Sequence, residues 1–111
     1  MIEVVRRYTR AEIKANPDKL YVFGDNMARV GLGGQAKEAR GEPNSVGIPT
    51  KWRPGKNDGD YFSNQDWVEV VPAFREAFAQ LNAHVQAGGV VASIYALLEA
   101  YRRRLFENGG T

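Results

Sequence analysis

The sequence predicts one small α/β domain in which a mixed sheet is flanked by helices. Two observations predict this class: short β-prone segments alternate with helical segments, and the chain has 111 residues, a usual size for one domain. Because parallel strands need crossover connections, the alternation also predicts that some strands pair in parallel. We therefore treat residues 1–111 as a single domain.

Four short segments predict strands, at residues 2–5, 20–23, 45–48 and 90–95. The run Leu20-Tyr21-Val22-Phe23 is continuous, β-prone and bounded by turn formers. This pattern is typical of a strand buried on both faces, so we expect it at the centre of the sheet.

Four segments predict helices, at residues 9–16, 35–40, 72–88 and 97–106. The third carries an apolar stripe with a 3.6-residue period, formed by Phe74, Phe78, Leu81 and Val85. We expect Pro72 in the first turn of that helix, because a proline farther inside would break it. A separate short turn should therefore precede the helix.

Composition excludes several classes of protein. The chain has no cysteine, which excludes a disulfide scaffold and a thiolate metal site and favours a reducing, cytoplasmic location. It has no apolar run of about 20 residues that could span a membrane and no signal-peptide pattern. The net charge of +2 does not indicate a nucleic-acid partner.

The candidate functional segment is the glycine-rich loop after the second predicted strand. That strand ends at Gly24-Asp25-Asn26, and Gly31, Gly33 and Gly34 precede the next helix. Ligands of open α/β sheets bind beyond the carboxyl ends of strands, where glycines let backbone amides approach a phosphate or sugar. The loop lacks the lysine and hydroxyl residue of a P-loop and the spacing of a dinucleotide fingerprint.

Three runs in the chain resemble a known family. Phe23-Gly24-Asp25-Asn26, Gly31 to Ala36 and Gly47-Ile48-Pro49-Thr50-Lys51 look like an uncharacterised family of short phage and bacterial proteins. That family is itself similar to macro domains, so the resemblance implies a macro-like fold and binding of ADP-ribose or a related nucleotide. Macro domains usually carry a second glycine-rich loop after a late strand, which residues 90–99 lack.

The resemblance also implies a role for individual residues. Asn26 would contact the ribose. Asp25 has no assured counterpart in that resemblance, but its carboxylate would position water as a general base if an ADP-ribosyl bond is hydrolysed, because that role requires only a carboxylate near the anomeric carbon. The other residues implied to bind the ligand are Gly24, Arg29, Gly31, Gly33, Gly34, Gln35, Thr50 and Lys51. No cofactor or metal is implied, and whether the protein is an enzyme stays open.

A second interpretation gives the loop a structural role only. The glycines would then permit a tight turn that Asp25 and Asn26 cap. The protein would be a non-enzymatic phage or bacterial accessory protein that acts through protein–protein association, for example as a homo-oligomer.

A third interpretation concerns nucleic acid. Trp52 lies between Lys51 and Arg53, so it could stack a base while the cations meet phosphates, with help from residues 102–104. Alternatively, the Trp52 ring packs at the rim of the fold and has no role in binding nucleic acid. His84, next to the apolar stripe, is interpreted as a boundary or exposed residue rather than a catalytic one.

Overall fold

The fold is that of a computed structural model, which describes residues 1–93. The strands are β1 (Ile2–Val4), β2 (Lys19–Asn26), β3 (Ser45–Lys51) and β4 (Val90–Ser93). The helices are α1 (Arg10–Ala15), α2 (Ala36–Ala39) and α3 (Trp67–Gln86), with single 3₁₀ turns at Asp58–Asp60 and Asn64–Asp66. The helix expected at residues 97–106 lies outside the described residues.

The strands form one sheet in the order β1-β4-β2-β3. β2 is an interior strand, which confirms the prediction that its apolar run is central. All three pairings are parallel, so the expected mixed sheet is corrected: within residues 1–93 the antiparallel component is one isolated bridge between Lys51 and Tyr61. The reason is that every connection between successive strands contains a helix, which returns the chain to the same end of the sheet.

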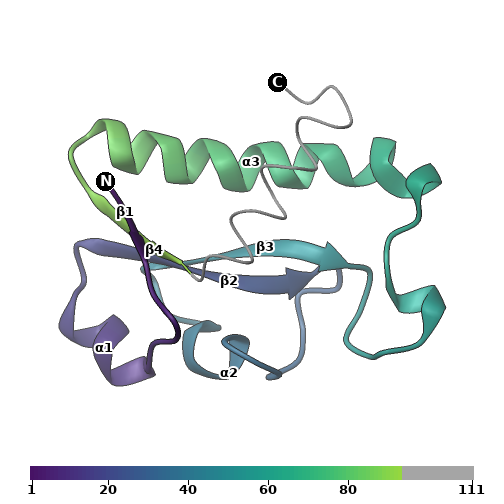
Figure 1. Ribbon diagram of the computed structural model, residues 1–111, viewed down its shortest axis with the longest axis horizontal. Helices are drawn as coiled ribbons and strands as arrows, with labels where there is room; N and C mark the ends of the chain where they lie inside the picture. The colour runs from purple at the N-terminus through teal and green to yellow at the C-terminus, as the bar shows by residue number, and fades with distance from the viewer. Residues whose placement is uncertain (94–111) are drawn as a thin grey trace.

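Helices cover both faces of the sheet, as an α/β class requires. Figure 1 shows α3 along one face, with α1 and α2 on the other. Side chains of β2 alternate between these layers, because successive residues of a strand point to opposite faces. The core under α3 contains Val22, Val46, Ile48, Trp67, Val70, Phe74, Ala77, Leu81 and Val91. The opposite core contains Tyr8, Ile13, Tyr21, Phe23, Ala36, Ala39 and Ala92.

α3 begins five residues earlier than the sequence predicts, so Pro72 lies inside it. Trp67 and Val70 explain the difference, because both are buried against the sheet and their burial favours a helical first turn. Within the predicted stripe, Phe74 and Leu81 are buried, but Phe78 is 45% exposed. No helix within residues 1–93 is both long and apolar enough to cross a membrane.

Candidate functional site

The glycine loop leaves the carboxyl end of the interior strand β2 and leads into α2, on the α1 and α2 side of the sheet (Figure 1). Residues 28–34 of this loop are exposed. The loop therefore lies where open α/β sheets bind ligands, and the rest of residues 1–93 does not cover it.

The loop presents a run of backbone amides. The N–H groups of residues 31–35 donate no hydrogen bond to any other group within the described part of the chain. Gly31 and Gly34 have φ angles of 97° and 56°, a region that favours glycine, so both turns depend on the missing side chain. The first amides of α2 bond to carbonyls of Gly33 and Gly34, and the free amides therefore precede the helix.

Asp25 lies beneath this loop at the end of β2, with a side chain only 3% exposed. Arg40 donates to both of its carboxylate oxygens, at 2.5 Å and 3.3 Å, and Arg29 donates to Oδ2 at 3.2 Å. One buried carboxylate thus joins two guanidinium groups from different segments of the chain.

The same contacts set the ionisation of Asp25. Burial alone would raise the pKa of this carboxyl, but hydrogen bonds from Arg40, from the Asn26 backbone and from Arg29 outweigh burial and lower the pKa. The carboxylate is therefore ionised at neutral pH and its oxygens are engaged with cations. Such a group is a weak general base, so the geometry favours a structural contact for Asp25, and the general-base role expected for it stays a prediction.

Arg40 connects the carboxylate to the loop. Its Nε donates to the Gly31 carbonyl at 2.8 Å and its Nη2 to the Val30 carbonyl at 3.2 Å. Its guanidinium also lies 5.4 Å from the centre of the Phe23 ring, a cation–π distance. Because Arg40 binds carbonyl groups, it fixes the loop without using the amides.

Asn26 is buried and supports the loop from within. Its Nδ2 donates to the Val30 carbonyl at 2.8 Å, and its Oδ1 accepts from the Val30 N–H at 3.5 Å. The side chain is therefore directed at the loop backbone, and the ribose contact implied by the resemblance stays a prediction.

Gln35 also has a structural partner. Its Oε1 accepts from the Tyr8 N–H at 2.8 Å, and its Nε2 donates to the Tyr8 carbonyl at 3.1 Å. Tyr8 is itself buried, and its hydroxyl donates to the Val22 carbonyl at 2.6 Å. Burial, together with the nearby Tyr21, raises the pKa of Tyr8, which keeps this hydroxyl protonated as a donor. Gln35 thereby joins the start of α2 to the segment before α1.

The last residues of β3, Thr50 and Lys51, both contact other parts of the chain. Thr50 donates from Oγ1 to the Asp25 carbonyl at 3.2 Å. Lys51 donates to the Gly55 carbonyl at 2.7 Å and lies 5.3 Å from the Tyr61 ring centre. Both residues are therefore near the predicted site, but their polar groups have protein partners.

Trp52 packs at the rim of the fold. Its ring meets Phe62 edge to face with centroids 5.2 Å apart, and its Nε1 donates to Asp66 at 3.0 Å. Backbone donation from Ser63 and this indole contact lower the pKa of the Asp66 carboxyl. The packing interpretation of Trp52 fits this geometry, whereas base stacking would need the ring free. Residues 102–104, the other part of the nucleic-acid interpretation, lie outside the described residues.

Gly24 and Gly47 lie on neighbouring strands. Gly24 pairs with Ile48 in the parallel register and is exposed. A Cβ atom on Gly47 would lie 2.7 Å from Asp25 Oδ2 and 2.9 Å from Phe23 Cζ. Only glycine at position 47 lets Asp25 keep its place, so Gly47 belongs to the structural support of the loop.

The sequence reasoning missed Arg40 and Gly47. A glycine inside a predicted strand is a recognised signal of close backbone approach, so Gly47 could have been found. Arg40 gave no such signal, because it is 15 residues from Asp25 and its partner is fixed only by the tertiary fold. His84 Nε2 lies 3.0 Å from the Asp18 carbonyl, to which its N–H can donate, and this contact agrees with a boundary position.

No metal centre is evident in the described chain, where no three His, Cys, Asp or Glu residues gather as ligands.

Comparison with protein families gives one finding: the model of a family of unknown function (DUF7831) matches residues 3–101, most of the chain. Searches of curated proteins and of solved structures give no significant match.

Proposed function

This chain belongs to the family of unknown function DUF7831, and we propose that its glycine loop binds a phosphorylated nucleotide of the ADP-ribose class. The observation that carries the proposal is the run of amides at residues 31–35, which have no hydrogen-bond acceptor within residues 1–93. Residues 31–34 of this run are exposed and Gln35 is half-buried. Consecutive N–H groups in turn conformations form concave sites that attract anions.

The loop is also preorganised, which reduces the entropy lost on binding. Arg40 and Asn26 hold the carbonyls of Val30 and Gly31, so the opposite groups of the backbone, the amides, remain available. Preorganisation of this kind supports a binding site rather than a flexible connection.

The class of ligand rests on the resemblance to macro domains, in which a glycine loop after a strand that ends in asparagine surrounds the distal ribose. The positions that match are Asn26, Gly31, Gly33 and Gly34. We propose binding as the primary activity, with Asp25 as a positioning residue, because its carboxylate already accepts from Arg29 and Arg40. Hydrolysis of an ADP-ribosyl bond would then need a different group to activate water.

Calorimetric titration of the folded protein with ADP-ribose tests the proposal. Parallel titrations with ADP, AMP and ribose 5-phosphate identify which part of the ligand the loop recognises. Saturating ligand must also raise the unfolding temperature by mass action. Absence of both heat and thermal shift at about 100 times a micromolar dissociation constant would overturn the proposal.

Gly33 offers a matched pair of variants, because a Cβ atom there meets nothing within 4 Å. Gly33→Asp places a carboxylate beside the amides and should weaken phosphate binding at least about tenfold by charge repulsion. Gly33→Asn has nearly the same shape without the charge and should stay close to the native affinity. Equal affinity of the two variants would show that the anion lies elsewhere.

A second candidate is protein–protein association through the tip of the same loop. Val30 and Leu32 are 51% and 65% exposed there, and aliphatic side chains at a loop tip can enter a partner's pocket. Light scattering after size exclusion, on the native chain and on Leu32→Ser, tests association with itself. A monomer at all concentrations would remove the homo-oligomer from this proposal.

A further inference from the structure

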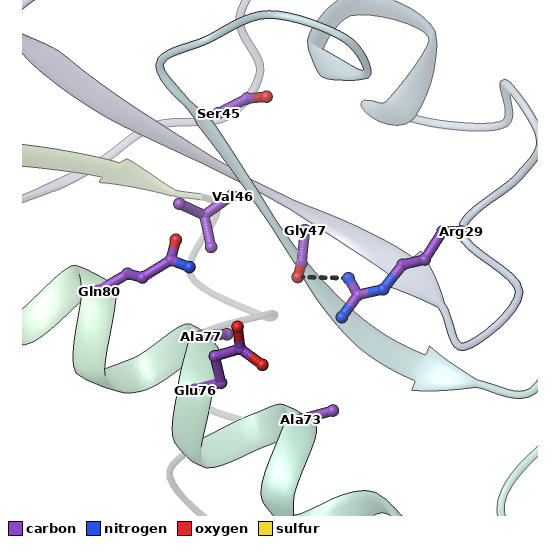
Figure 2. A pocket seen from close by; sticks show the side chains of 8 residues that line it. All are labelled: Arg29, Ser45, Val46, Gly47, Ala73, Glu76, Ala77 and Gln80. Carbon is purple, nitrogen blue, oxygen red and sulfur yellow. Dashed lines mark hydrogen bonds between the residues drawn. The ribbon is translucent and has the colours of Figure 1, made fainter.

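A hollow of about 230 Å³ lies between α3 and β3, an edge strand of the sheet formed by residues 1–93. Its wall contains the small residues Ala73, Ala77 and Gly47, which leave the space that larger side chains would fill. Figure 2 shows Glu76 and Gln80 projecting from α3 toward the strand, and Arg29 reaching Gly47 from the loop. Neither the resemblance nor the glycine loop assigns a role to this hollow.

Arg29 is held in place rather than free in solvent. Its backbone has a φ angle of 59°, which is costly for a side chain with a Cβ atom. Its Nη1 donates to the Gly47 carbonyl at 2.9 Å and to Asp25 at 3.2 Å. Within residues 1–93 its Nε and Nη2 donate to no group, so part of a positioned guanidinium remains available at the hollow.

The wall formed by α3 carries the complementary groups. Glu76 and Gln80 are one helical turn apart, on the same side of α3. Neither side chain makes a hydrogen bond or ion pair in the described part of the chain. Although Arg29 and Glu76 line one hollow, no ion pair within 4.0 Å joins them. Arg29 is paired with Asp25 through Nη1, so its Nε and Nη2 donors and the Glu76 carboxylate are the groups that remain for a ligand.

We propose that this hollow binds a small zwitterion of free amino-acid size. Its carboxylate would pair with Arg29, which offers planar N–H donors that match a carboxylate. Its ammonium group would pair with Glu76, and Gln80 would supply a neutral donor and acceptor. The volume is below the range of about 300–1,000 Å³ typical of drug-sized ligands, which favours a molecule with few non-hydrogen atoms.

The charge pattern discriminates between ligand classes. A simple anion would meet Arg29 but also the negative charge of Glu76, and a simple cation would meet the reverse. A zwitterion satisfies both charges and therefore fits better than either. This site is separate from the amides of residues 31–35, so it does not depend on the proposed function.

The test is a titration of ¹⁵N-labelled full chain, followed through the amide signals of Gly47, Ala73 and Ala77. L-Glutamine is the first probe, because its side-chain amide can pair with that of Gln80. Two blocked probes, N-acetyl-L-glutamine and L-glutaminamide, each lack one of the charges. For a ligand this small we expect a dissociation constant of about 0.1–10 mM for L-glutamine. Both blocked probes should bind at least about tenfold more weakly.

Glu76→Gln and Glu69→Gln form the matched variants, because both glutamates are exposed on α3 but only Glu76 lines the hollow. Glu76→Gln should weaken L-glutamine binding at least about tenfold, and Glu69→Gln should leave it unchanged. Absence of shifts at these amides, equal binding of the blocked probes, or equal loss in both variants would overturn the proposal. ADP-ribose binding should be unaffected by Glu76→Gln, which separates a failure here from a failure at the glycine loop.

Discussion

The contact between Arg40 and Asp25 should contribute strongly to stability, and Arg40→Met tests it. Methionine keeps much of the apolar stem that packs near Phe23 but removes the guanidinium and its hydrogen bonds to Asp25, Val30 and Gly31. Within residues 1–93, the buried Asp25 carboxylate would then keep Arg29 as its one cationic partner.

The magnitude follows from how buried each partner is. Removing one partner of a fully buried ion pair costs about 3–5 kcal/mol. The Arg40 side chain is 21% exposed and Arg29 still neutralises part of the charge, so we expect a smaller loss of about 2–3 kcal/mol. For a domain of this size that loss lowers the unfolding temperature by about 10–20 °C.

Urea denaturation followed by tryptophan fluorescence measures the loss, and a double-mutant cycle with Asp25→Asn isolates the pair. Lys19→Met is the control, because Lys19 pairs with Glu3 and both side chains are about one-third exposed, at 30% and 35%. The control should cost about 0–1 kcal/mol. If Arg40→Met costs no more than Lys19→Met, the argument that Asp25 is a buried anchor of the loop is refuted.

Three further predictions concern the same structure. Gly47→Ala should destabilise by about 1–3 kcal/mol in urea denaturation, because its Cβ would lie 2.7 Å from Asp25 Oδ2. Gly33→Ala, whose Cβ meets nothing, should change stability by less than about 0.5 kcal/mol, and equal losses would contradict the packing argument. Tyr8→Phe should cost about 1–2 kcal/mol by removing the buried bond to Val22, and an unchanged unfolding midpoint would argue against that bond. The pKa of Asp25 is lowered from its ordinary value of 3.8 in the folded state. The stability it contributes is therefore present above that pH and lost as the pH falls through the folded-state pKa. Unfolding midpoints measured below about pH 4 should fall less steeply for Asp25→Asn than for the native chain.

Local patterns were enough to predict the elements of the fold. The apolar run of Leu20 to Phe23 identified the interior strand, because burial on both faces requires a continuous apolar segment. The first helix was predicted to begin at residue 9, and the Thr9 side chain does cap that helix by accepting from the Glu12 amide. These signals act over a few residues, and the fold preserves them.

Tertiary packing determined the features of the fold that local sequence patterns could not predict. The first turn of α3 precedes Pro72 because burial of Trp67 and Val70 outweighs the cost of a proline inside the helix. The strand order β1-β4-β2-β3 likewise depends on tertiary packing, because no local pattern specifies which strands are neighbours.

The candidate site, too, could be predicted from the sequence only in part. The sequence located the loop, because its glycines and the preceding strand are adjacent in the chain. The partners of Asp25 could not be derived from the sequence, since Arg40 reaches it only after α2 packs beneath the sheet. The hollow beside β3 could not be predicted from local patterns either, because Arg29 and Glu76 come to it from separate segments of the chain.

Hydrogen exchange of the amides at residues 31–35, measured by NMR with and without ADP-ribose, tests the central claim most directly. In the ligand-free protein these amides should exchange nearly as fast as in an unfolded chain, and saturating ADP-ribose should slow them while the β2 amides stay protected. Slow exchange before ligand is added would contradict the account, because those N–H groups would already have acceptors.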